Sequence, residues 1–237
     1  MRANLEVLPD LDALAVRAAD LIMSVALSKP RVAIALSGGS TPRPVYRLLA
    51  TPPRLEAFPW AHVHWFWGDE RFVPPDDPAS NYRMARETML ARAPVPADHI
   101  HPMPTVGLSP DAAAEAYERT LKEFYGADRL APDRPLFDLN LLGLGTNGHT
   151  ASLFPGMPVL QERQRWVGTM HDPEAGTRIT LTYPALESSR EVVFLVAGAE
   201  KKAVLRKVLD GDQSQPAARL RPQGTLRFLA DRAAGSK

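Results

Sequence analysis

The N-terminal part of the chain alternates between a helical and a strand-like pattern of apolar side chains. Between residues 10 and 28, leucine, alanine, isoleucine and valine recur every three or four positions, which predicts an amphipathic helix. The apolar run at 31–37 predicts a buried strand, and Pro42 lies just inside a second helix that extends through 45–50. The chain therefore begins with a helix, a strand, a polar loop and a second helix.

The same alternation continues along the rest of the chain. Strands are predicted at 63–69, 136–143 and 191–198, and helices at 80–93 and 200–209. Continuous apolar strands separated by helical segments are typical of a mostly parallel sheet with helices on both faces. We therefore predict an α/β fold of this kind, related to the Rossmann arrangement.

Composition narrows the possible functions. The 28 basic and 27 acidic residues leave a net charge of +1, which provides no broad basic surface for nucleic acid or for an anionic membrane. No run of 18 apolar residues occurs, and charges interrupt the N-terminal stretch where a signal peptide would be apolar, so we expect a cytoplasmic protein. The absence of cysteine excludes thiolate chemistry. The prolines are scattered rather than clustered in a linker, so we expect a single domain over residues 1–237.

Four polar clusters each follow directly after a predicted strand. They are SGGSTP (37–42), GDER (68–71), GLGTNGH (143–149) and AGAEK (197–201). The carboxyl ends of parallel strands lie at one edge of a sheet, and ligands of such folds bind there. We therefore expect these four clusters to meet in one site.

The first cluster has the composition of an anion-binding loop. Backbone N–H groups at Gly38 and Gly39 can approach an anion closely, the hydroxyls of Ser37, Ser40 and Thr41 add donors, and a helix begins directly afterwards. The lysine and spacing of a Walker loop are absent. From this stretch alone, an ordinary glycine turn in which Ser40 or Thr41 caps the helix fits equally well.

Charged residues in and near the other clusters have two interpretations. Asp69 and Glu70, with Arg71, suit acid–base chemistry and the binding of an oxyanion, but an internal salt bridge would have the same pattern. Arg178 and Lys201 can complete an anion site, although single cations of this kind are most often surface charges.

Histidine occurs in two H-x-H pairs, His62/His64 and His99/His101. Alternate residues of a strand lie on one face, as a pair of metal ligands requires. Neither pair has an evident third ligand in the sequence, so we expect solvated or hydrogen-bonded histidines and no bound metal.

His149 stands in a different context from these pairs. Gly143, Gly145 and Gly148 permit a tight turn with positive φ, and residues 149–154 could begin a helix whose N–H groups face the site. An imidazole with an ordinary pKa of about 6.5 can exchange protons near neutrality. The position of His149 among converging polar loops therefore favours a catalytic role over a structural one.

Six blocks of the sequence occur in the order of a known enzyme family. They are SGGSTP (37–42), DERFVPPDDPASNYRMARETML (69–90), IHPM (100–103), FDLNLLGLGTNGHTASLFPG (137–156), RITLTYPAL (178–186) and AGAEK (197–201). Together they resemble the 6-phosphogluconolactonase family over nearly the whole chain. The resemblance implies an α/β fold related to glucosamine-6-phosphate deaminases, no cofactor, and hydrolysis of 6-phosphoglucono-1,5-lactone in the pentose phosphate pathway.

The resemblance also assigns roles to residues at matching positions. It makes His149 the general base, with Asp69 as a further catalytic candidate, and leaves Arg71 near the reacting end or the phosphate. It also implies that the substrate phosphate binds close to residues 37–41, Arg178 and Lys201.

One position departs from the family pattern, in which the loop usually reads D-G-H. This chain has Asn147 instead of the aspartate. An amide oxygen can still fix the tautomer of His149, but it supplies no charge to favour the imidazolium. Asp69 or Glu70 would then supply that charge, or the aspartate is not essential.

Two alternative functions remain open from the sequence. A glucosamine-6-phosphate deaminase would share the fold, but its loop resembles D-G-H-I-A-F-N-E-P-G, and this chain has Asn147 and Phe154 where that loop is acidic. A sugar-phosphate-binding module without catalysis is the second alternative, although the sequence shows no helix-turn-helix pattern or basic face. In each case we expect a small phosphosugar partner, neither nucleic acid nor membrane, and a monomer or a dimer.

Overall fold

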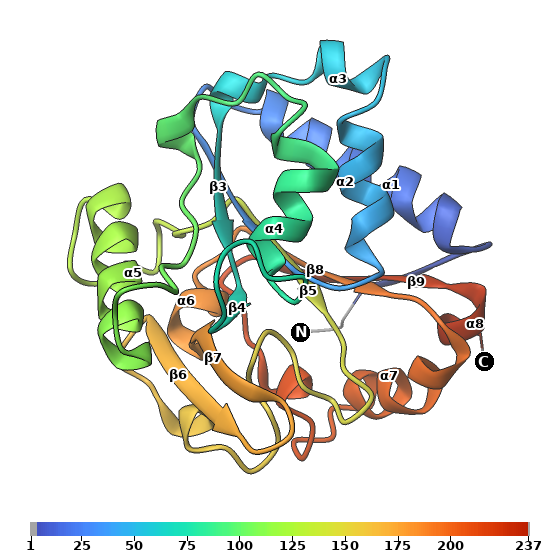
Figure 1. Ribbon diagram of the computed structural model, residues 1–237. Helices are drawn as coiled ribbons and strands as arrows, with labels where there is room; N and C mark the ends of the chain where they lie inside the picture. The colour runs from blue at the N-terminus through green and yellow to red at the C-terminus, as the bar shows by residue number, and fades with distance from the viewer. Residues whose placement is uncertain (1–3, 237) are drawn as a thin grey trace.

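A parallel sheet forms the centre of the computed structural model, which describes residues 4 to 236 (Figure 1). Across this six-stranded sheet the order is β1 (Asn4–Leu8), β9 (Thr225–Asp231), β8 (Glu191–Val196), β5 (Leu139–Gly143), β2 (Val32–Leu36) and β3 (Val63–Trp67). All neighbouring strands in it run parallel. Every residue of β2 is buried, which explains its continuous apolar run.

Helices cover both faces of this sheet, so the predicted α/β fold is confirmed. The α-helices are α1 (Leu11–Leu27), α2 (Pro42–Leu49), α3 (Arg54–Ala57), α4 (Asn81–Ala85), α5 (Pro110–Tyr125), α6 (Tyr183–Glu187), α7 (Lys202–Leu209) and α8 (Arg232–Gly235). Short 3-10 turns occupy Trp60–His62, Ala97–His99, Pro158–Gln161, Ala199–Lys201 and Pro216–Arg219. In Figure 1, α1 and α2 lie on one side of the sheet and α7 lies on the other.

The first two helices begin as the sequence predicts. The Asp10 carboxylate accepts a hydrogen bond from the Ala13 N–H at 2.8 Å and thereby caps α1. Pro42 is the first residue of α2, but the side chain of Thr41 makes no capping hydrogen bond. Of the two alternatives left open for this loop, the ordinary turn in which the Thr41 hydroxyl caps the helix is therefore not the one that forms.

The predicted strand at 63–69 is shorter than expected because the chain changes sheets at Gly68. The Gly68 N–H donates to the Leu36 carbonyl at 2.9 Å, whereas the Gly68 carbonyl accepts from the Leu181 N–H at 2.8 Å. A second, antiparallel sheet then begins, with the strand order β4 (Asp69–Arg71), β7 (Gly176–Leu181) and β6 (Val167–Asp172). This second sheet was not predicted from the sequence.

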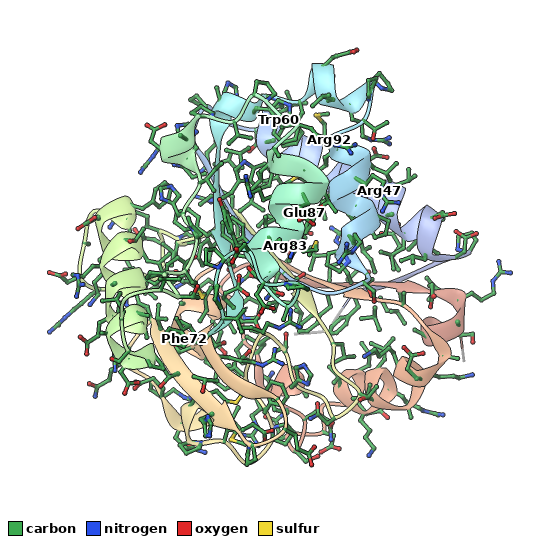
Figure 2. All side chains as sticks on the ribbon, viewed as in Figure 1. Arg47, Trp60, Phe72, Arg83, Glu87 and Arg92 are labelled. Atoms are coloured by element: carbon green, nitrogen blue, oxygen red, sulfur yellow. The ribbon has the colours of Figure 1, made fainter. Side chains whose placement is uncertain are left out.

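Other predicted elements also need correction. The strand expected at 136–143 begins at Leu139, and the helix expected at 80–93 becomes a π-helix at Arg86–Leu90. Arg83 and Glu87, labelled on this helical segment in Figure 2, form an ion pair at 2.6 Å. The helix expected at 149–154 does not form.

The segment after His149 adopts a turn rather than a helix because its polar groups bond to other segments. Ala151 has a left-handed φ of 47°, which is incompatible with a regular helix. The Ser152 N–H donates to the Thr180 hydroxyl at 3.1 Å, and the Ser152 hydroxyl donates to the Asp69 carboxylate at 2.5 Å. These bonds attach the loop to the second sheet.

The topology opens a crevice between β2 and β5. After β2 the chain passes to β3 on one side, whereas after β5 it passes to β8 on the other side. The loops at 37–41 and 144–149 therefore diverge from neighbouring strands, which is the position at which parallel α/β sheets bind ligands.

None of the helices in the described part of the chain is both long and apolar enough to cross a membrane.

Three histidines of the H-x-H pairs form a cluster at β3, an edge strand of the central sheet. His64 Nδ1 lies 3.1 Å from His101 Nε2, and the rings of His64 and His99 stack with centroids 3.9 Å apart. The backbone N–H of His101 donates to the Trp65 carbonyl at 2.9 Å, and this bond holds the segment that carries His101 against the edge strand. His62 lies outside the cluster, with Nδ1 3.4 Å from the Ala26 carbonyl oxygen.

Two histidines of the cluster, His64 and His101, have lowered pKa values. Burial, followed by the nearby His99, His101 and Arg31, lowers the pKa of His64 to about 4, although Asp98 opposes this shift. Burial and His99 also lower the pKa of His101. Among residues 4 to 236, no group of three or more His, Cys, Asp or Glu side chains could hold a metal ion.

Acid should destabilise the protein through this cluster. Unfolded histidines titrate near pH 6.5, whereas folded His64 stays neutral down to about pH 4, so the unfolded state binds more protons between these values. The contribution of neutral His64 to the stability of the protein is therefore fully present above about pH 6.5 and is lost as the pH decreases. We expect His64→Gln to reduce the stability lost between pH 7 and pH 5 by on the order of 1 kcal/mol, since solvent screens a partly exposed ring.

Urea unfolding at several pH values would measure this effect. His171→Gln is the matched control, because His171 is exposed and bonds only locally, with Nδ1 2.9 Å from the Thr177 hydroxyl. The control should lose as much stability on acidification as the wild type. An unchanged loss in His64→Gln would contradict the prediction.

Candidate active site

A cavity of about 290 Å³ lies at the carboxyl ends of β2, β5 and β8, where β4 and β7 also reach it. The side chains and loops that line it come from all four polar clusters of the sequence. The predicted site residues in its lining are Ser37, Gly38, Gly39, Ser40, Thr41, Asp69, Arg71, His149, Arg178 and Lys201. The structure therefore brings together every predicted site residue except Asn147, which is exposed but contacts the ring of His149.

The loop after β2 keeps hydrogen-bond donors available to the cavity. The buried Tyr46 hydroxyl donates to the Ser37 carbonyl at 2.8 Å and accepts from the Ser37 N–H at 3.1 Å, which fixes the end of the strand. The Ser37 hydroxyl is buried and has no hydrogen-bond partner within the described residues. The N-terminus of α2 follows at Pro42, and it contributes mainly its dipole, because Pro42 and Pro44 have no N–H to donate. These features suit the binding of an anion.

Gly38 has a steric reason to be glycine. A Cβ atom at this position would lie 1.7 Å from the Asn81 side-chain oxygen. The loop can therefore pass close to Asn81 only because position 38 carries no side chain.

Asp69 is a buried carboxylate that joins three segments. It accepts the Ser152 hydroxyl at 2.5 Å and the Asn81 amide at 3.3 Å, and it lies 3.9 Å from an Arg178 guanidinium nitrogen. Ser152 is fully buried, and its hydroxyl is committed to this contact. Ser152 is therefore poorly placed to act as a nucleophile.

Asn81 is a site residue that the sequence analysis missed. Its side-chain oxygen accepts from the Arg71 guanidinium at 2.6 Å, and its amide nitrogen donates to the Asp69 carbonyl at 2.9 Å. The Ala79 carbonyl also accepts from Arg71, at 2.8 Å. The one available signal was the position of Asn81 within the matching block 69–90, because an asparagine beside a helix start is otherwise unremarkable in a sequence.

Glu70 belongs to the support of the site rather than to its lining. Its carboxylate accepts backbone N–H groups from Arg71, Asn81 and Tyr82 at 2.7 to 2.8 Å, and the Ser80 hydroxyl at 3.0 Å. Burial raises the pKa of Glu70, and these hydrogen bonds oppose that shift. Because its oxygens are used in this way, Glu70 is not available to supply charge to His149.

Asn147 fixes the tautomer of His149. The Asn147 oxygen lies 2.6 Å from His149 Nδ1 and also accepts the His149 backbone N–H at 3.2 Å. The backbone group can only donate, so the oxygen of the amide must face the imidazole. Nδ1 therefore carries the proton and Nε2 keeps its lone pair.

The pKa of His149 differs from the ordinary value expected from the sequence. Burial is the largest cause and lowers it to about 4, and Arg178, Lys201 and Arg71 add to the effect, whereas Asp69 opposes it. The imidazole is consequently neutral at pH 7, in the form that accepts a proton.

The loop after β8 contributes both signs of charge. Gly198 has a φ of 104°, and its N–H donates to the Asp231 carboxylate at 3.0 Å, which fixes the turn that follows β8. Lys201 and Glu200 both line the cavity. Glu200 was not selected from the sequence, and nothing in the AGAEK pattern separates its role from that of a surface carboxylate.

The sequence and the fold both match known proteins. A family model described as "Glucosamine-6-phosphate isomerases/6-phosphogluconolactonase" matches residues 9–228. The chain is 42% identical to a 6-phosphogluconolactonase of Nostoc sp., over 100% of this chain and 99% of the relative. The crystal structure of 6-phosphogluconolactonase from Thermotoga maritima matches with a TM-score of 0.81 and 31% identity, over 97% of this chain and 99% of that one.

A more distant enzyme shares the fold alone. A monomeric glucosamine-6-phosphate deaminase matches with a TM-score of 0.85 and 21% identity, over 98% of this chain and 99% of that one. The family match, which spans most of the chain, and the identity to relatives over its full length lead to one conclusion: this chain belongs to the glucosamine-6-phosphate isomerase/6-phosphogluconolactonase family.

Proposed function

We propose that this protein hydrolyses 6-phospho-D-glucono-1,5-lactone to 6-phospho-D-gluconate, with His149 as the general base. The observation that carries the proposal is a neutral imidazole of fixed tautomer in a cavity that is also lined by Arg71, Arg178 and Lys201. Such a cavity suits a substrate with an anionic group at one end and an electrophilic carbonyl at the other. The names of the relatives agree with this substrate.

In the proposed reaction, Nε2 of His149 takes a proton from the water that attacks the lactone carbonyl carbon. The carbonyl oxygen becomes an oxyanion, which Arg71 or backbone N–H groups stabilise. The tetrahedral intermediate then collapses with cleavage of the bond between the carbonyl carbon and the ring oxygen. The imidazolium returns its proton to that ring oxygen, and the product acid ionises in water.

The phosphate end of the substrate is proposed to lie against residues 37–41. The unpartnered Ser37 hydroxyl, the N-terminus of α2 and the cations Arg178 and Lys201 all favour a dianion there. Arg71 is held by Asn81 and Ala79, so its position does not depend on the substrate.

Deaminase activity is the weaker alternative despite the shared fold. Deamination of an amino sugar needs several proton transfers, and thus more ionisable groups. In this loop Asn147 and Phe154 stand where the deaminase pattern is acidic, and the Phe154 ring stacks on His149.

Removal of the imidazole should abolish most of the catalysis. We expect His149→Ala to lower kcat/KM for 6-phosphogluconolactone by at least about a hundredfold, the usual range for a general base. The assay uses freshly generated lactone and subtracts spontaneous hydrolysis. His171→Ala, an exposed histidine outside the cavity, should keep the wild-type rate. Equal rates for His149→Ala and wild type would remove His149 from the mechanism.

The protonation of His149 can be followed directly in the free protein. Because burial lowers its pKa to about 4, its ring signals in NMR spectra should stay constant from pH 7.5 to about pH 5 and shift only below that. Comparison with His149→Ala assigns the signals. A midpoint between pH 6 and 7 would show that water solvates the imidazolium freely, contrary to this prediction.

A carboxylate at position 147 should be tolerated. In Asn147→Asp the acceptor for His149 Nδ1 remains, and the added charge favours the imidazolium, so the pKa of His149 should rise. We expect lactonase activity not to fall and the NMR midpoint of His149 to move to higher pH. If activity dropped by about tenfold or more in a folded variant, about 1.4 kcal/mol of transition-state stabilisation would depend on the amide itself.

A further inference from the structure

We propose that Gly145 and Phe154 clamp the imidazole of His149 between them, and that Phe154 is a positioning residue which holds the candidate base and shields it from water. Phe154 does not line the cavity. The proposal therefore assigns it a role that acts through His149. Its kinetic part rests on the proposed function, whereas its structural part does not.

One face of the imidazole lies against the backbone of Gly145. A Cβ atom at this position would lie 2.1 Å from both Cε1 and Nδ1 of the His149 ring and 2.7 Å from its Cγ. These distances put the missing Cβ above the ring plane rather than beside its edge. Gly145 has no positive φ, so glycine is required here for space and not for backbone conformation.

The other face of the imidazole is covered by Phe154. The two ring centroids are 4.0 Å apart and the planes are inclined by 9°, which is a stacked pair. A ring stacked at this distance leaves no room for a backbone atom on the same side. Gly145 and Phe154 must therefore lie on opposite faces of His149.

The edges of the imidazole complete the arrangement. Nδ1 faces the Asn147 oxygen at 2.6 Å, and the Gly145 N–H donates to the His149 carbonyl at 2.9 Å, which closes the loop around the ring. With both faces and the Nδ1 edge occupied, rotation of the ring is blocked. The remaining edge, which carries Nε2, is the one available to the cavity.

Phe154 also lies close to a cation of the site, Arg178. The Arg178 guanidinium carbon lies 5.5 Å from the centroid of the Phe154 ring. The same aromatic ring thus touches the candidate base and a candidate phosphate ligand.

The clamp explains why the imidazole is poorly solvated. An apolar ring on one face and a backbone on the other keep water away from both faces of the imidazole, and this burial disfavours the charged form. The alternative is that Phe154 only fills space at the margin of the core, against which it is partly buried. A substitution that keeps the apolar volume but removes the flat ring separates the two possibilities.

Phe154→Leu is that substitution. We expect kcat to fall by about tenfold while KM changes by less than about threefold, because the base is misplaced and the phosphate ligands remain. In the free protein the NMR midpoint of His149 should move up by about 1 pH unit toward the ordinary histidine value. Phe154→Tyr keeps the stacked plane and should restore both properties.

The matched control is Phe124→Leu, which removes a partly buried phenylalanine that packs at a tilt against His64 and His101, outside the cavity lining. It should leave kcat and the His149 midpoint unchanged. A wild-type midpoint for His149 in a folded Phe154→Leu protein would overturn the clamp. A shifted midpoint in a protein whose wild type shows no lactonase activity would support the clamp and refute the proposed function instead.

Discussion

A buried carboxylate needs hydrogen-bond donors or a cation beside it, and the geometry of the site depends on the partners of Asp69. The Ser152 hydroxyl comes from the loop after β5, the Arg178 guanidinium from β7 and the Asn81 amide from α4. An unpaired charge in the interior would cost several kcal/mol. The same contacts therefore hold the loop of His149, a cation of β7 and the start of α4 at fixed positions around the cavity.

The alternation of side chains along β4 gives its three charged residues, Asp69 to Arg71, two different functions. Successive residues of a strand point to opposite faces, so Asp69 and Arg71 share one side and Glu70 faces the other. Asp69 and Arg71 line the cavity, whereas Glu70 binds the backbone of residues 80–82. One carboxylate thus serves the site, and its neighbour holds the segment that positions Asn81 against Arg71.

The sequence predicted the parallel sheet and the convergence of the polar clusters because both follow from local pattern and from the geometry of parallel strands. It did not predict the second sheet, because β4 has only three residues and its pairing with β7 spans more than 100 positions. The pKa of His149 was also beyond reach. It depends on burial of the ring and on the surrounding charges, and a glycine or phenylalanine in a sequence does not reveal that it packs against His149.

In the proposed mechanism, the cations of the cavity would act on the substrate and on His149 at once. Arg178, Lys201 and Arg71 favour an anionic substrate, and in the free protein they also disfavour the imidazolium of His149. A bound phosphate dianion would offset their charge, so substrate binding would raise the basicity of His149 when a proton acceptor is needed. An amide at position 147 suits this arrangement, because it orients the imidazole without adding a permanent negative charge. In the proposed mechanism, the charge that strengthens the base would then come from the substrate phosphate.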